Sequence, residues 1–110
     1  MSDERARRVG LNESLFRRVN EEIESLHRSF GDPRSMAAIC ECGDGECLER
    51  IEIPLADYER VRSDPRLFVV MPGHVLPDLE SVVDRAAAYE VVRKRDGTAT
   101  EVAERTDPRS

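Results

Sequence analysis

Three cysteines lie within eight residues of this chain, and thiols clustered in this way can bind a metal ion. Cys40 and Cys42 are two residues apart, so in an extended segment both side chains project from the same face. Gly43-Asp44-Gly45 supplies a reversal that brings Cys47 back over the first pair, with both glycines free to take positive φ. Structural zinc sites use four Cys or His ligands, with sulfur at about 2.3 Å, so the cluster predicts three ligands of a zinc ion.

A histidine is the expected fourth ligand, because the chain contains only three cysteines and two histidines. His74 ends the sequence Met71-Pro72-Gly73-His74, a tight turn after an apolar stretch, and a rigid turn can carry a ligand to a distant site. His27 lies in the middle of an expected helix and is the less favoured alternative. The sequence therefore predicts one zinc ion bound by Cys40, Cys42, Cys47 and His74.

Other uses of these thiols stay open. Free cysteines are often buried as small apolar residues, although clustering around glycines in a polar stretch argues against that use. A cluster of redox-active thiols is a second alternative. A disulfide is disfavoured by the odd number of cysteines and by the small, strained ring that a Cys-x-Cys bridge would close.

A helix over residues 12–30 is predicted upstream of the cysteines. Asn12 is a suitable N-cap, and Gly31-Asp32-Pro33 ends the helix. Between them, apolar residues recur at steps of three and four, namely Phe16, Val19, Ile23, Leu26 and Phe30. This stripe is expected to pack on the sheet of the same domain. The alternative is a helix that binds a partner or a second copy, since the spacing also fits a short coiled coil.

Short strands are expected to position the two parts of the metal site. Residues 36–39 and 49–53 flank the cysteine turn and are predicted to form a hairpin similar to a zinc ribbon. A short helix follows this hairpin. The apolar strand 67–71 then delivers His74 through the Pro72-Gly73 turn.

The last third of the chain has a weaker pattern. Residues 78–85 are expected to be a short helical or extended piece and residues 89–94 a strand, because alanines favour helix whereas paired valines favour strand. The alternative is a hairpin of residues 81–85 and 89–94. The polar residues after Gly97 are expected to form a short final element and a loose tail.

These elements predict an α+β fold, in which a long N-terminal amphipathic helix packs on a small, mostly antiparallel sheet with a zinc-ribbon-like metal turn. We expect a flexible N-terminus over residues 1–11, a single zinc-stabilised domain over 12–96 and a C-terminal tail over 97–110. Aromatic residues make up only 5% of the chain, so apolar burial is thin and a metal ion would supply additional stability.

Charge and hydropathy argue against several kinds of partner. The net charge is −6, and residues 38–85 hold eleven acidic residues against five arginines. Such a surface repels phosphate backbones, so nucleic acid is not an expected partner. The N-terminus lacks the apolar core of a secretory signal, and no stretch approaches the ~18 apolar residues of a membrane span. We therefore expect a cytoplasmic protein without membrane contact.

Several segments together form a recognisable pattern. They are Asn12-Glu13, Phe16 to Glu21, Cys40-Glu41-Cys42-Gly43 to Cys47, Tyr58-Glu59, Val61-Arg62, Phe68 to Pro72-Gly73-His74, and Tyr89 to Lys94. Over residues 12–107 the chain resembles a family of small proteins found in actinobacteria and related bacteria, for which the pattern carries no assigned function. The resemblance implies that the cysteines act with His74, and it implies no activity. Ala86-Ala87-Ala88 departs from the polar turn that similar sequences have there.

Enzyme signatures are absent from the sequence. It has no phosphate-binding loop, no dinucleotide glycine pattern, no His-Glu-x-x-His and no Gly-x-Ser-x-Gly. A zinc ion held by four side chains also lacks the open position that catalysis needs. Glu41 and Glu46, beside the cysteines, are expected to be solvated acids.

The expected function is therefore a non-enzymatic protein-interaction or regulatory module with a structural zinc site. Its contact with a protein partner, or with a second copy, is expected through helix 12–30. A thiol-based redox or zinc sensor is the main alternative. A zinc hydrolase with three protein ligands and a bound water is a weaker third possibility.

Overall fold

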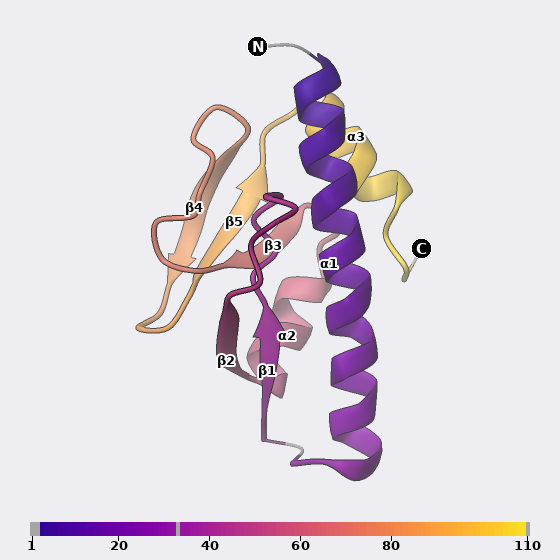
Figure 1. Cartoon of the computed structure of the whole chain (residues 1–110), viewed down its shortest axis with the longest axis vertical. Helices are drawn as coiled ribbons and strands as arrows, with labels where there is room; N and C mark the ends of the chain where they lie inside the picture. Colours follow the sequence, from indigo (N-terminus) through magenta and orange to yellow (C-terminus); the bar gives the residue numbers. More distant parts are fainter. Residues whose placement is uncertain (1–2, 33, 110) are drawn as a thin grey trace.

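The computed structural model describes residues 3–32 and 34–109, and Figure 1 shows the order of its helices and strands. Helices and antiparallel strands are combined in one chain, which confirms the predicted α+β class. The elements are α1 (Asp3–Phe30), β1 (Ser35–Ile39), β2 (Arg50–Pro54), α2 (Leu55–Arg62), β3 (Leu67–Val70), β4 (Glu80–Arg85), β5 (Glu90–Lys94) and α3 (Thr98–Arg105).

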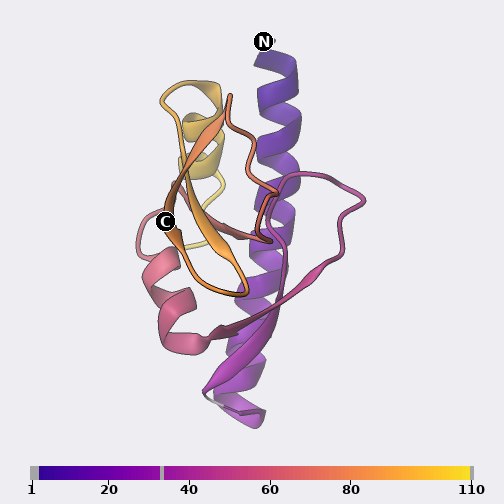
Figure 2. The ribbon, with the colours of Figure 1, turned by 90° about the vertical axis from the view of Figure 1, so that its left-hand side faces the viewer.

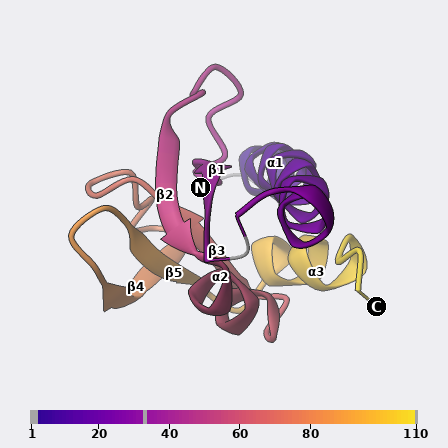
Figure 3. The same ribbon diagram turned by 90° about the horizontal axis from the view of Figure 1, so that it is seen from below.

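Two small sheets lie to one side of α1 (Figure 3). β1 and β2 form an antiparallel hairpin, in which Met36 pairs with Ile53 and Ala38 pairs with Ile51. The second sheet has the strand order β3-β5-β4. Burial alternates along β2, so that its isoleucines face the core and its charged residues face solvent. The predicted hairpin around the cysteine turn is therefore present.

One apolar cluster is shared by both sheets, by α2 and by the cysteine turn. Cys40 and Cys42 belong to this cluster and are buried. α2 contributes Leu55, Tyr58 and Val61, whose side chains are also buried. The remaining strand residues of the cluster with the least exposure are Met36, Ala38, Ile51, Ile53, Phe68, Val69, Val70 and Val92. The first two thiols are thus part of the core, and they anchor the cysteine turn in it.

Both ends of the described chain are more regular than the sequence suggests. α1 begins at Asp3, so Asn12 lies inside the helix and is not its N-cap. α3 occupies residues 98–105 and packs against α1, so the short final element expected before the tail is a helix. Gly10 explains the close approach, because a Cβ atom at this position would lie 2.9 Å from Cγ1 of Val102. The two terminal segments support each other, which a local sequence pattern does not reveal.

The face of α1 that packs on the rest of the protein is largely polar, and the predicted apolar stripe is only partly buried. Phe16 is buried, whereas Leu26 and Phe30 are exposed. Arg17 is buried instead, and its guanidinium donates hydrogen bonds to the carbonyls of Pro65 at 2.6 Å and Ala103 at 2.8 Å. The other buried polar residues of this face are Glu13, Ser14, Asn20 and Glu24. Among the described residues, no helix combines the length and apolar composition needed to cross a membrane.

Residues 80–85 form a strand, so the hairpin alternative is the correct one for this part of the chain. β4 pairs with β5 in antiparallel register, with an irregularity between Val82 and Asp84. Ala86 to Ala88 form the exposed connection, closed by a 2.8 Å hydrogen bond from Ala86 N to Tyr89 O. Pairing with β5 therefore overrides the helical preference of the alanines.

Candidate metal centre

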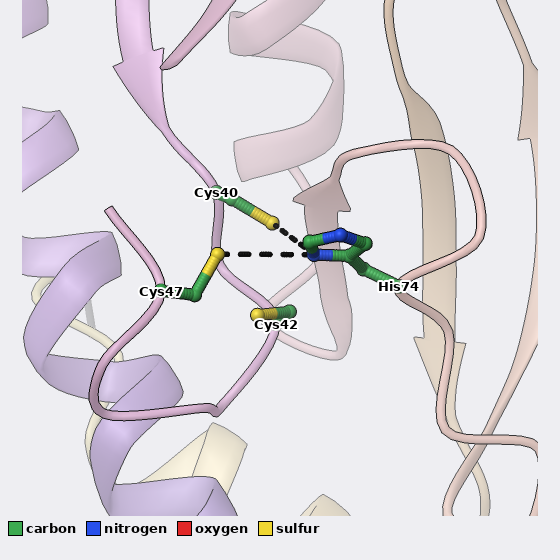
Figure 4. Close-up of side chains that lie close together, drawn as sticks. All are labelled: Cys40, Cys42, Cys47 and His74. Carbon is green, nitrogen blue, oxygen red and sulfur yellow. Dashed lines mark hydrogen bonds between the residues drawn. The ribbon is translucent and has the colours of Figure 1, made fainter. Parts of the chain in front are cut away.

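The cysteine turn connects β1 to β2 and is closed by its own backbone. Cys40 N donates to Glu49 O at 2.8 Å, at the base of the turn. Cys47 N donates to Asp44 O at 3.0 Å, and the side chain of Asp44 accepts a 2.9 Å hydrogen bond from Glu46 N. These contacts return the chain on itself, as the glycine spacing predicts, and bring Cys47 over the first two thiols (Figure 4).

Gly43 is the glycine on which this turn depends. Its φ is +84°, and a Cβ atom would lie only 2.6 Å from Cγ1 of Val9 and 3.2 Å from Cγ of Glu13. Of the two glycines that are free to take a positive φ, only Gly43 adopts one, and Gly45 does not. Asn12 donates from Nδ2 to the Gly43 carbonyl at 3.0 Å. The turn is therefore seated directly on α1.

His74 reaches the cysteines from the connection between β3 and β4, which lies beside the cysteine turn in Figure 2. A turn with His74 N donating to Met71 O at 3.0 Å, and with Gly73 at φ +86°, reverses the chain after β3. His27 is far from this arrangement in the fold, near the end of α1, and its Nδ1 lies 3.2 Å from Asp32 O. The structure thus brings together the histidine that the sequence favours.

The four side chains lie close enough together to hold one metal ion. Nδ1 of His74 lies 3.6 Å from Sγ of Cys40 and 3.8 Å from Sγ of Cys47. The ligand atoms of Cys40, Cys42, Cys47 and His74 all lie within 4.8 Å of one another. Bonds of about 2.3 Å to sulfur and 2.0–2.1 Å to nitrogen place tetrahedral S and N ligands about 3.6 Å apart. The four groups can therefore hold a metal ion.

Backbone N–H groups stabilise negative charge on the sulfurs. Met71 N donates to Sγ of Cys40 at 3.2 Å. A hydrogen bond from the Cys40 thiol lowers the pKa of Cys42 to about 5, and the N–H of Asp44 acts in the same direction. That contact, together with burial, raises the pKa of Cys40. Burial also raises the pKa of Cys47, against the lowering effect of the Glu49 N–H. One thiolate is therefore favoured before any metal is bound.

Glu41 corrects one prediction, because it is completely buried and not solvated. Its carboxylate accepts hydrogen bonds from Asn20 Nδ2 at 2.8 Å, Tyr58 Oη at 2.8 Å and Val69 N at 3.0 Å. Burial raises the pKa of Glu41, and these donors oppose that shift. In an extended segment Glu41 points to the face opposite Cys40 and Cys42, and in this fold that face is the core. Glu46 is exposed, as expected.

A pocket of about 380 Å³ adjoins the thiol and imidazole groups. Cys42 and His74 line it, together with Arg5, Val9 and Leu76. Cys47 and His74 are themselves partly exposed. Small solutes can therefore reach the edge of the cluster even though Cys40 and Cys42 are buried in the core.

Comparison with protein-family models, with curated proteins and with solved structures finds no significant match. The resemblance to the actinobacterial family therefore stays a prediction. The geometry of the cysteines and His74 is what carries a functional interpretation of this chain.

Proposed function

We propose that this chain binds one zinc ion through Cys40, Cys42, Cys47 and His74, and that it acts as a small non-enzymatic module for protein interaction or regulation. The observation that carries this proposal is the convergence of three sulfurs and one imidazole nitrogen within 4.8 Å, from segments on either side of α2. Zinc would join the turn between β1 and β2 to the connection after β3. Its free energy of binding would add to the stability of a small core.

The donor set supports zinc over other common metals. Magnesium and calcium prefer oxygen ligands, whereas thiolates and imidazole suit zinc in a four-coordinate site. Iron also binds thiolates, usually in clusters held by four cysteines, and this chain has only three. The S–N distances of 3.6 and 3.8 Å are close to the edge of a zinc tetrahedron, about 3.6 Å.

The same donor set supports a structural role. Four side chains fill the four positions of a tetrahedral zinc ion, and a catalytic ion needs one position for water or substrate. Cys40 and Cys42 are also packed in the main apolar cluster, where zinc would tie the sheets together. The acidic charge of residues 38–85 disfavours nucleic acid and leaves a protein as the partner.

Native mass spectrometry of two histidine variants tests the site. Wild-type protein is expected to carry one zinc ion. The His74→Ala variant should lose it in a chelator competition, with affinity weakened by on the order of a hundredfold. His27→Ala is the matched control, since His27 lies away from the cysteines, and should keep the ion. Retention of wild-type affinity by His74→Ala would reject this ligand set. A crystal structure of the wild-type protein with water on the ion in place of His74 would reject the non-enzymatic assignment.

A thiol-based redox or zinc sensor is the second candidate, supported by the partial exposure of Cys47 and by the adjoining pocket. In this scheme two thiolates give two electrons to hydrogen peroxide, which takes up two protons and leaves as two waters. One disulfide forms, and zinc is released. Stoichiometric zinc release during titration with peroxide would support a sensor, and an unreactive zinc-loaded protein would exclude it.

A further inference from the structure

Four large apolar side chains of α1 are exposed on the described surface. Leu11 is 52% exposed, Leu15 58%, Leu26 57% and Phe30 88%. At 100° per residue they fall on one side of the helix, roughly opposite Glu13, Arg17, Asn20 and Glu24, which are buried. Figure 3 shows α3 and the sheets grouped around the other side of α1. We call these four residues the outer stripe.

The steps between residues of the outer stripe are the same whether the helix is read forwards or backwards. Leu11 and Leu15 are four residues apart, Leu15 and Leu26 are eleven apart, and Leu26 and Phe30 are four apart. When two such helices lie antiparallel about a two-fold axis, residue i of one faces residue 41 − i of the other. Leu11 then faces Phe30 and Leu15 faces Leu26, so every member of the stripe meets an apolar partner.

Charges on the same surface also match in this arrangement. Arg18 and Glu22 are exposed, lie between the two apolar pairs, and make no ion pair with a described residue of their own chain. The antiparallel register brings Arg18 of each helix next to Glu22 of the other, on both sides of the two-fold axis. A parallel arrangement would instead face Arg18 with Arg18 and Glu22 with Glu22.

A hollow on α1 lies beside Leu15, where the proposed register places Leu26 of the second copy. Leu11, Ser14, Leu15 and Arg18 line about 190 Å³ together with Thr106. Four helix residues at positions i, i+3, i+4 and i+7 form the hole that receives one side chain in knobs-into-holes packing. In the register above, the side chain that faces this hole is Leu26 of the second copy.

We infer that α1 binds α1 of a second copy of this chain, antiparallel, through the outer stripe. This inference rests on the proposed role as an interaction module and names its partner. The interface consists of one helix from each chain, so its area is small and the dimer is expected to depend on concentration.

Sedimentation velocity with zinc-loaded protein, from about 1 µM to 1 mM, tests the inference. The mass should rise from that of the 12.5 kDa chain towards twice that value. The variant with both Leu15→Glu and Leu26→Glu should weaken dimerisation at least about a hundredfold, because charges replace buried leucines. Zinc content and helical circular dichroism serve as controls for folding, and they separate failure of the dimer from failure of the metal site.

Two charge reversals test the antiparallel register. Arg18→Glu alone, or Glu22→Arg alone, should weaken self-association about fivefold to tenfold by placing like charges together. An equal mixture of the two variants should recover dimers, since each chain then meets the opposite charge. A wild-type protein that stays monomeric up to 1 mM would overturn the inference. Equal dimerisation of wild type and both single reversals would overturn the register.

Discussion

Tyr58 donates a 2.8 Å hydrogen bond from its hydroxyl to the carboxylate of Glu41, the residue between two of the proposed zinc ligands. Asn20 and the N–H of Val69 donate to the same carboxylate. Contacts from α1, α2 and β3 therefore meet at the side chain of Glu41, inside the cysteine turn. The position of the turn is fixed by this buried network as well as by the proposed metal ion.

Replacing Tyr58 with phenylalanine should destabilise the zinc-loaded protein, because Glu41 would lose a donor inside the core. The expected loss is about 1–3 kcal/mol in the free energy of unfolding. Tyr89→Phe is the control, since Tyr89 donates only a longer, partly exposed bond of 3.2 Å to Asp57, and should cost about 0.5–1 kcal/mol. Urea unfolding measures both. Equal losses would show that the Glu41 network carries no special weight.

Alanine at Gly43 should be far more harmful than alanine at Gly73. Both glycines have positive φ, which costs a side chain about 1–2 kcal/mol. Gly43→Ala adds a clash with Val9, worth about 1–3 kcal/mol, and should push the cysteine turn off α1. A Cβ at Gly73 meets no atom within 4 Å, so this variant measures the backbone effect alone. Gly43→Ala should lower the unfolding temperature and the zinc affinity more than Gly73→Ala does. Similar losses in the two variants would contradict the packing of the turn on α1.

Removing zinc with a chelator should loosen the metal centre before the second sheet. Exchange of amide hydrogens is expected to become faster at Cys40, Cys47 and Met71, whose N–H groups bond within the turn or to a ligand sulfur. The amides that pair β3 with β5 should stay protected. Hydrogen exchange followed by mass spectrometry distinguishes this outcome from uniform loss of protection, which would mean that the whole fold depends on the ion.

Stability should also depend on pH through Glu24. Burial raises the pKa of Glu24 from 4.5 to about 7, and a hydrogen bond with Glu59 adds to the shift. Because the folded state holds this proton more tightly, its contribution is complete below pH 4.5 and is lost as the pH rises through 7. The hydrogen bond from Arg109 lowers the pKa of Glu59 to about 2. The contribution of Glu59 to stability therefore changes only in more acidic solution, below pH 4.5.

Glu24→Gln should therefore gain about 1 kcal/mol relative to wild type between pH 5 and pH 8, allowing for solvent screening. Glu4→Gln, at an exposed position of the same helix, is the control and should show no such trend. The comparison uses the difference between variant and wild type at each pH, so the effect of pH on the metal ligands cancels. A difference that stays constant with pH would rule out the buried proton on Glu24.

The grouping of the four candidate ligands could be predicted because their geometry is mostly local. Because Cys40 and Cys42 are two residues apart, their side chains point to the same face. Gly43 then reverses the chain and brings Cys47 back to them. His74 could be chosen because the chain offers only one other histidine and the Pro-Gly turn fixes its place after a strand. The hairpin around the turn followed from the alternating residues of β2.

The polar contacts between distant segments could not be predicted. Nothing near Arg17 or Asn20 in the sequence indicates that Ala103 and Ile39 supply their partners. The apolar stripe of a helix is usually buried, and on that basis Leu26 and Phe30 were expected to face the sheet. In the structure both are exposed. Lys94, buried between Glu13 and Glu80, joins three separate elements in the same way. Burial of charge depends on tertiary partners, and hydropathy patterns do not encode those partners.

X-ray absorption at the zinc edge tests the central claim most directly. The protein purified with one zinc per chain should show three sulfur ligands at about 2.3 Å and one nitrogen at about 2.0–2.1 Å. His74→Ala should lose the nitrogen shell or the metal, while His27→Ala should match wild type. A first shell dominated by oxygen, or one with fewer than three sulfurs, would contradict a zinc centre built from Cys40, Cys42, Cys47 and His74.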